Sequence, residues 1–155
     1  MLPIHTILFP TDFSENAERA FPLACALARD CGARIVVLYV MPLPVGDEQF
    51  QARHHPDDYF AGAWEALHQV RAPDSNVRVE HRLEEGDAAK RILELADEVE
   101  AGLIVMGTHG RTGFRRLLMG SVAEQVMRAA PCPVLTLKAP LPVGTEQTAE
   151  AALAK

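Results

Sequence analysis

Short apolar segments alternate with amphipathic segments along most of this chain, and the alternation constrains the fold more than any other feature of the sequence. The apolar segments predict strands at residues 4–9, 34–40, 77–83, 103–107 and 134–138. The segments between them have helical periodicity and predict helices at residues 14–28, 59–70, 89–99 and 121–130. This order predicts an α/β fold with a parallel, doubly wound sheet and right-handed crossovers.

A few residues bear on the boundaries of these elements. Pro10 is expected to end the first strand, and Pro22 predicts either a kink in the first helix or a later start of it. Gly102 is expected to end the helix that precedes it. Apolar and charged residues alternate over residues 77–83, which indicates a strand with one solvated face, as at the edge of a sheet.

The composition is that of one ordinary globular domain. The chain has 155 residues, of which 48% are hydrophobic and 23% are charged. No apolar run approaches the ~18 residues that span a bilayer, and the N-terminus does not resemble a signal peptide, so a cytoplasmic protein that contacts no membrane is expected. The spacing of Cys25, Cys31 and Cys132 matches neither a zinc site nor a disulfide framework, so reduced thiols are expected.

The charge distribution indicates the kind of ligand. A net charge of -6 argues against binding to nucleic acid, which requires a surplus of lysine and arginine. Residues 107–138 nevertheless contain five basic residues and a single acid, Glu124. A locally positive region in an acidic protein indicates a small anionic ligand rather than a polymer.

A glycine-rich stretch follows the fourth predicted strand and begins this positive region. Gly107, Gly110 and Gly120 precede Ser121, where the next helix is expected to start. In an open parallel sheet, ligands bind beyond the carboxyl ends of the strands where the strand order reverses, so Asp12 would face the same crevice. Glycine amides and a helix N-terminus are both suited to hold a phosphate.

Charged side chains could complete such a phosphate site. Arg111, and with it Arg115 and Arg116, could donate charge-assisted hydrogen bonds, and Asp12 could accept from ribose hydroxyls or help to hold Mg²⁺. The spacing is not that of a Walker A loop, because no lysine follows Gly120, and it is not GxGxxG. From spacing alone, a phosphate-binding loop and a turn-rich loop without a ligand both remain open.

Two motifs taken together carry a resemblance to a known family. The sequence PTD follows the first strand, and Gly107-x2-Gly110-x9-Gly120-Ser121 follows the fourth. This combination resembles the ATP-binding branch of the universal stress protein family, over residues 1–138, with residues 139–155 left as a C-terminal tail. The resemblance implies a Rossmann-like, three-layer α/β/α sandwich with a five-stranded parallel sheet of order 3-2-1-4-5.

The resemblance also implies a ligand and an assembly. It implies binding of ATP, with Mg²⁺ held mainly by the phosphates, in a regulatory module of the stress response that acts on an unidentified downstream protein. It implies a homodimer through the last strand, from Val134 to Lys138. The residues implied at the nucleotide, from the phosphates to the adenine, are Gly107, Gly110, Gly120, Ser121, Met106, Arg111, Val122, Asp12, Thr11, Pro10 and Val40.

Other candidate residues have simpler interpretations. His54 and His55 lie near two aspartates in the loop after the second strand, but adjacent residues rarely converge on one ion, so no metal site is expected there. His81 is expected to be a core or edge histidine, and His109 is expected to face solvent. Aromatic residues at helical spacing are expected in the core, namely Phe60 and Trp64.

No known catalytic motif occurs in the chain, neither a GxSxG elbow nor an HExxH pair, so no catalytic residue is predicted. Two alternatives to nucleotide-dependent regulation stay open. One is a slow ATPase or nucleotidyl transferase that uses the same crevice, with Asp12 as metal ligand or base. The other is a scaffold that binds no nucleotide and works through its last strand.

Overall fold

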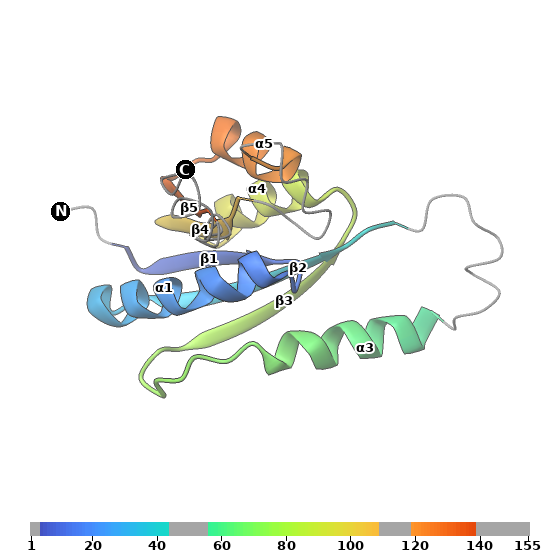
Figure 1. Cartoon of the computed structure of the whole chain (residues 1–155), viewed down its shortest axis with the longest axis horizontal. Helices are drawn as coiled ribbons and strands as arrows, with labels where there is room; N and C mark the ends of the chain where they lie inside the picture. Colours follow the sequence, from blue (N-terminus) through green and yellow to red (C-terminus); the bar gives the residue numbers. More distant parts are fainter. Residues whose placement is uncertain (1–3, 44–55, 109–118, 139–155) are drawn as a thin grey trace, which may run out of the picture.

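The computed structural model describes residues 4–43, 56–108 and 119–138. These residues form one parallel sheet, and its strand order β3-β2-β1-β4-β5 confirms the predicted order (Figure 1). The five strands are β1 (Thr6–Thr11), β2 (Arg34–Met41), β3 (Val79–Glu85), β4 (Leu103–Gly107) and β5 (Val134–Leu137). The predicted division into a domain of residues 1–138 and a tail of residues 139–155 stays a prediction, because the tail lies outside the described residues.

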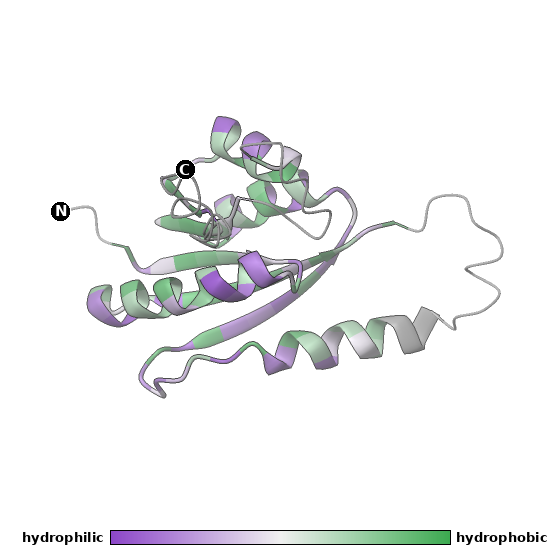
Figure 2. Cartoon of the chain, viewed as in Figure 1, coloured by the Kyte–Doolittle hydropathy of each residue, from purple (hydrophilic) through white to green (hydrophobic). Residues whose placement is uncertain are grey.

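The described residues also form four helices, which cover the two faces of the sheet in the predicted three-layer arrangement. They are α1 (Glu15–Cys31), α3 (Pro56–Gln69), α4 (Ala88–Glu98) and α5 (Ser121–Ala129). Side chains alternate across β1, so Ile7 and Phe9 pack against α1, whereas Leu8 packs against α4 and α5. Buried side chains therefore form one apolar cluster on each face, and the middle parts of the central strands are mainly apolar (Figure 2).

Helix α1 begins well before Pro22, although a start after this proline was one of the two expectations. Ser14 caps the helix, because its Oγ accepts a hydrogen bond from the N–H of Ala17 at 3.3 Å. The helix then runs through Pro22 to Cys31, so the expected later start was wrong. Buried alanines lie on both sides of Pro22 and hold both halves of the helix on the sheet, which offsets the hydrogen bond that the proline removes.

Strand β1 also continues past the proline that was expected to end it. Pro10 pairs with Leu38 of β2, and the strand ends one residue later, at Thr11. The register of β1 with β4 comprises only Ile7 and Leu8. Pro10 therefore lies beyond the β1–β4 pairing, where its missing N–H leaves no partner in β4 unsatisfied. Because the pairing stops at Leu8, β1 and β4 are not paired at their carboxyl ends, and the sheet is open there.

Helix α4 ends before the glycine that was expected to end it. The helix stops at Glu98, and Glu100 rather than a glycine has the left-handed backbone, with φ of 51°. Gly102 is instead a packing residue: a Cβ there would lie 3.1 Å from Cα of Ile4. The expectation for Gly102 was wrong because tight packing against Ile4, in the segment before β1, and not a turn, requires this glycine.

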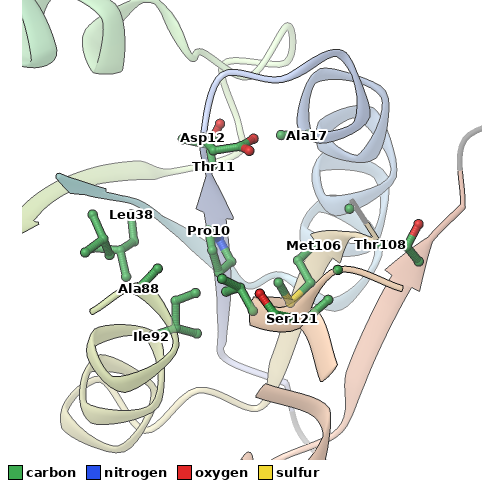
Figure 3. Close-up of a pocket in the computed structure, with 15 residues that line it drawn as sticks. Pro10, Thr11, Asp12, Ala17, Leu38, Ala88, Ile92, Met106, Thr108 and Ser121 are labelled. Carbon is green, nitrogen blue, oxygen red and sulfur yellow. The ribbon is translucent and has the colours of Figure 1, made fainter. Parts of the chain in front are cut away.

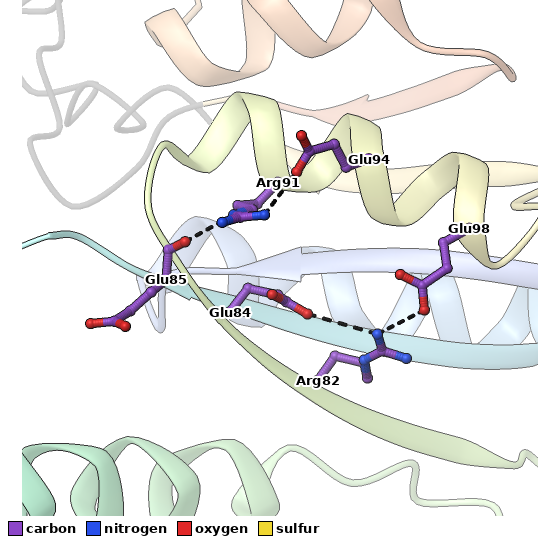
Figure 4. Close-up of polar contacts among 6 residues, drawn as sticks. All are labelled: Arg82, Glu84, Glu85, Arg91, Glu94 and Glu98. Atoms are coloured by element: carbon purple, nitrogen blue, oxygen red, sulfur yellow. Dashed lines mark hydrogen bonds and ion pairs between the residues drawn. The ribbon is translucent and has the colours of Figure 1, made fainter.

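The two edge strands differ in character. On β3, Arg82 donates a hydrogen bond to Glu98 of α4 at 2.9 Å and lies 3.7 Å from Glu84 (Figure 4). The hydrogen bond that Arg82 donates to the carboxylate of Glu98 raises the pKa of Arg82 above its ordinary value. The charged face predicted for an edge strand is thus confirmed for β3, whereas the other edge strand, β5, consists of Val-Leu-Thr-Leu. No helix within the described part of the chain is long and apolar enough to cross a membrane.

Candidate nucleotide-binding site

A pocket opens at the carboxyl ends of β1 and β4, where the sheet diverges (Figure 3). Nine residues expected at the ligand line this one pocket, although they come from segments more than a hundred positions apart in the sequence. They are Pro10, Thr11, Asp12, Val40, Met106, Gly107, Gly120, Ser121 and Val122. The remaining two, Gly110 and Arg111, lie outside the described residues, as do His109, Arg115 and Arg116.

The turn between β1 and α1 forms one wall of the pocket and is fixed by its own side chains. The N–H of Phe13 donates to Oγ1 of Thr11 at 3.1 Å, and the N–H of Ser14 donates to Oδ1 of Asp12 at 3.0 Å. Short side chains that accept from the backbone two residues later are typical of tight turns. One carboxylate oxygen of Asp12 is therefore committed to the turn, and this contact holds its carboxylate at the pocket.

Phe13 adopts a backbone conformation that bulky residues rarely use. Its φ is 58°, in the left-handed region, which is unusual for an aromatic residue. The ring packs on Tyr39 of β2, with 4.6 Å between the ring centroids and 54° between the planes. This aromatic contact supplies part of the free energy that maintains the strained turn next to Asp12.

Gly107 allows β4 to approach the first turn of α1. A Cβ at Gly107 would lie 3.1 Å from Cβ and 3.2 Å from the carbonyl carbon of Asn16. Neither Gly107 nor Gly120, the two described glycines that line the pocket, has positive φ, and φ is −74° at Gly120. Among the described glycines, positive φ occurs at Gly32 and Gly86. Gly107 is thus explained by the close approach of Asn16 and not by a left-handed backbone.

The two ends of the glycine-rich stretch are held together. The N–H of Gly120 donates to the carbonyl oxygen of Thr108 at 2.6 Å, and the N–H of Thr108 donates to the carbonyl oxygen of Leu137 at 2.9 Å. Thr108 is buried, with 5% of its surface exposed. These bonds place the end of β4 and the start of α5 side by side at the pocket.

The N-terminus of α5 is directed to the pocket without a side-chain cap. Gly120 is the N-cap residue and has no side chain to accept from the first turn, and the following residues Ser121, Val122 and Ala123 line the pocket. The main-chain N–H groups of a first helical turn have no partner within the helix, and the helix dipole is positive there. This end of the pocket is therefore suited to an anion such as a phosphate.

The opposite wall of the pocket is apolar and comes from β2 and α4. Leu38 and Val40 lie two positions apart on one face of β2, and Ala88 and Ile92 lie on consecutive turns of α4. Of these, only Val40 was expected at the ligand. The alternation of side chains along a strand would have indicated Leu38 from Val40, whereas nothing in the sequence placed Ala88 and Ile92 against them.

Hydrogen bonds near the ends of β2 and β3 hold the start of α4, which supplies part of this wall (Figure 4). Nε of Arg91 donates to the carbonyl oxygen of Glu85 at 2.9 Å, and Nη1 donates to Glu94 at 3.0 Å. The N–H of Gly86 donates to the carbonyl oxygen of Met41 at 2.9 Å. The helix is capped by Asp87, which accepts from the N–H of Lys90 at 2.8 Å. The apolar wall is thus built on anchored main chain.

The other candidate residues lie away from the pocket. His81 is a half-buried residue of the edge strand, as expected, and its Nε2 lies 2.8 Å from the carbonyl oxygen of Val70. Phe60 and Trp64 are each 37% exposed, so their expected core position was wrong: the buried face of α3 is formed by Leu67 instead. Trp64 stacks on the ring of His68 with 5.3 Å between the centroids.

The cysteines are unpaired, and they differ in exposure. Cys25 is buried and Cys132 is half-buried, and burial raises the pKa of both thiols. Cys31 is exposed. Within the described residues, no three acidic, histidine or cysteine side chains are grouped as a metal site. His54 and His55 lie outside this part of the chain.

Known proteins resemble this chain in sequence and in structure. The model of the universal stress protein family matches residues 3–138. Universal stress protein MJ0531 of Methanocaldococcus jannaschii is 36% identical over 143 residues, which cover 86% of this chain and 82% of the relative.

Solved structures show the same fold. Universal stress protein UspA from Lactobacillus plantarum has a TM-score of 0.75 at 27% identity, over 86% of this chain and 97% of its own. A universal stress protein from Archaeoglobus fulgidus, solved in complex with dAMP, has a TM-score of 0.59 at 28% identity, over 88% of this chain and 98% of its own. The matched family model, the sequence relative and the shared fold lead to one conclusion: the chain belongs to the universal stress protein family.

Proposed function

We propose that this chain is a cytoplasmic, nucleotide-dependent regulatory protein of the stress response, and that it binds ATP in the pocket between β1 and β4. The observation that supports the proposal best is the convergence of Asp12, the apolar β2 wall and the uncapped N-terminus of α5 on one pocket. The polar turn suits the ribose of a nucleotide, the apolar wall suits its base, and the anion site suits its phosphates.

Each part of the nucleotide has a proposed partner. The phosphates lie at Gly120, Ser121 and Val122, where main-chain N–H groups and the Ser121 hydroxyl donate to phosphate oxygens. The glycine-rich stretch, with Gly110 and Arg111, adds further donors. The end of β4, at Met106 and Gly107, adjoins the phosphates.

The nucleoside lies against β1 and β2. Pro10 and Thr11 contact it at the end of β1, and the main chain at Val40 faces the adenine, which packs on the apolar wall. Asp12 accepts from ribose hydroxyls or assists in holding Mg²⁺, which the phosphates chiefly bind. Either role places the ligand beside the turn, where the contact with the N–H of Ser14 holds the carboxylate of Asp12 at the pocket.

An adenine nucleotide is favoured over other anions by the relatives. The universal stress protein from Archaeoglobus fulgidus was solved with dAMP, which shares the adenine base with ATP and carries one phosphate. A ligand that binds only the folded state, present at 100 times its dissociation constant, stabilises a protein by about 2.7 kcal/mol. Occupancy by a nucleotide can therefore select one conformation for a downstream protein.

The direct test is to identify the resident ligand. The purified protein is denatured with acid, the released nucleotides are separated by chromatography, and the refolded or nucleotide-free protein is titrated with MgATP, MgADP, AMP and MgGTP in a calorimeter. We expect an adenine nucleotide in the extract and saturable binding of MgATP but not of MgGTP. No released nucleotide together with no heat of binding for any adenine nucleotide would reject the proposal.

Binding rather than turnover is the proposed activity. Among the described residues that line the pocket, Asp12 is the one acidic side chain, and none is a histidine, lysine or cysteine. The alternative, a slow ATPase or nucleotidyl transferase, requires Asp12 as metal ligand or base. Steady release of ADP that stops in Asp12→Asn, while MgATP still binds, would favour that alternative.

We further propose a homodimer through the last strand, which the sequence analysis placed from Val134 to Lys138. Strand β5 is the edge of the sheet and all four of its residues are half-buried in the single chain. An apolar edge strand needs a cover in solution. Light scattering should give the mass of two chains, and a purely monomeric protein at high concentration would contradict this assembly.

A further inference from the structure

A second pocket lies at the opposite end of the sheet, at the amino ends of β1 and β2 and just before β3. It shares no described residue with the nucleotide pocket. Three separate segments form it: the residue before β1, the end of α1 with the turn into β2, and the segment before β3. Its described lining residues are His5, Ala28, Arg29, Gly32, Ala33, Arg34, Asn76 and Arg78.

The charge of this pocket is opposite to that of the protein. Three arginines line it and none of its described lining residues is acidic, whereas the whole chain has a net charge of -6. The nearest acids along the chain are already engaged. Asp30 accepts from Nε of Arg29 at 3.1 Å, and Asp74 accepts from the N–H of Asn76 at 2.9 Å.

Two of the arginines are held next to each other by the strand register. Ile35 of β2 pairs with Val79 of β3, and the N–H of Ile35 donates to the carbonyl oxygen of Arg78 at 2.8 Å. The residues that precede this pair, Arg34 and Arg78, are therefore neighbours. Two like charges held side by side repel each other, so an anion beside them would stabilise this arrangement.

Glu80 compensates only one of these two charges. Nη1 of Arg34 donates to both carboxylate oxygens of Glu80, at 2.9 and 3.1 Å, and Nε of Arg34 donates to Oγ1 of Thr6 at 3.2 Å. Arg34 is thereby fixed in place. For the guanidinium of Arg78, the structure shows no hydrogen bond or ion pair with any described residue, and Arg78 is an exposed residue that lines the pocket.

We propose that this pocket binds a small oxyanion of the phosphate class, with Arg78 as its principal ligand. A guanidinium presents several N–H donors in a planar fork that matches phosphate oxygens. The Asn76 amide and the His5 ring line the same pocket and offer further N–H donors. Arg34, whose fork already faces Glu80, contributes a fixed positive wall and not a new hydrogen bond.

The turn between α1 and β2 leaves room for such an anion. Gly32 ends α1 with φ of 66°, and a Cβ at this position would meet no atom within 4 Å. The N–H of Ala33 is already bonded to the carbonyl oxygen of Ala28 at 2.8 Å. The turn is therefore rigid and open, and its amides should report occupancy of the pocket without themselves binding the anion.

The test is a residue-resolved titration of the full chain with inorganic phosphate, at constant ionic strength, followed by amide chemical shifts. We expect saturable shifts at Gly32, Ala33 and Asn76. Arg78→Gln should weaken this response about tenfold or more, because a charge-assisted hydrogen bond is lost. Arg19→Gln removes an exposed arginine of α1 that lies outside the pocket, and should leave the response unchanged.

The shifts at Ser121 and Val122 are read separately, because phosphate can also enter the nucleotide pocket. The proposal is overturned if the amides of Gly32, Ala33 and Asn76 show no saturable response, or if Arg78→Gln and Arg19→Gln weaken it equally. Shifts confined to Ser121 and Val122 would likewise overturn it while leaving nucleotide binding intact. The two proposals therefore fail independently.

Discussion

The main-chain N–H of Gly120 donates a hydrogen bond to the carbonyl oxygen of Thr108 across 2.6 Å, and this bond joins the two ends of the glycine-rich stretch. Because Thr108 directly follows strand β4 and Gly120 is the N-cap residue of helix α5, the bond fixes where the first N–H groups of that helix lie. The position of the helix end proposed to bind the phosphates thus depends on a main-chain contact between these two residues.

Gly120→Val should weaken MgATP binding by at least about tenfold, because two methyl groups then stand where the phosphates approach the helix N-terminus. The matched control is Gly62→Val, since Gly62 lies in α3 and a Cβ there meets no atom within 4 Å. Calorimetric titration of both variants checks the expectation. Equal affinities in the two variants would mean that the nucleotide does not approach Gly120.

Asp12→Asn should lower the affinity for MgATP about tenfold and leave the melting temperature nearly unchanged. The asparagine keeps an oxygen that can accept from the N–H of Ser14, so the turn persists while the charge at the ribose and Mg²⁺ is lost. Asp12→Ala removes the turn bond as well and should also destabilise the fold, by about 1 kcal/mol. Unchanged MgATP affinity in Asp12→Asn would show that the carboxylate does not contact the ligand.

Phe13→Gly should be more stable than Phe13→Ala, by about 1 kcal/mol, because only glycine adopts a φ of 58° without strain. Both variants lose the contact with Tyr39 and should be less stable than the natural chain. Urea unfolding measures the difference. Leu27→Gly and Leu27→Ala in helix α1 serve as the control pair. There the alanine variant should be the more stable one, because glycine is the poorer helix residue. If the alanine variant were more stable than the glycine variant at both positions, the left-handed backbone of Phe13 would be contradicted.

Cys31 should react with iodoacetamide first, and Cys25 and Cys132 much later. Burial raises the pKa of the last two thiols, so at about pH 8 a smaller fraction of them is the reactive thiolate. Their labelling should accelerate as the pH rises toward the raised pKa. Mass spectrometry of the native and the urea-unfolded chain reads out the three sites. Cys25 labelled as fast as Cys31 in the native chain would contradict its buried position.

Much of this fold follows from sequence pattern alone. The order of strands and helices, the cap at Ser14 and the edge position of β3 all rest on periodicities and capping rules that depend on nearby residues. Errors arose where distant packing decides the outcome. Pro22 stays in a helix because buried alanines hold it there, and Gly102 serves a contact with Ile4 that is remote in sequence.

The candidate site shows the same division. The motif residues could be predicted, because their spacing is typical of a family and the switch point of a doubly wound sheet follows from topology. Ala88 and Ile92 could not, because only the packed position of α4 brings them to the pocket. The strained backbone of Phe13 also leaves no mark in the sequence, since no rule assigns positive φ to phenylalanine.

The contrast between the two edges of the sheet limits how large an assembly of this chain can grow. If two copies join through β5, both outward-facing edges are β3 strands, which carry Arg82 and Glu84 and are bound to α4 through Glu98. Charged edge strands resist the addition of a further strand. Pairing through β5 would therefore terminate after one step, giving a closed pair of chains with no template for a fibre.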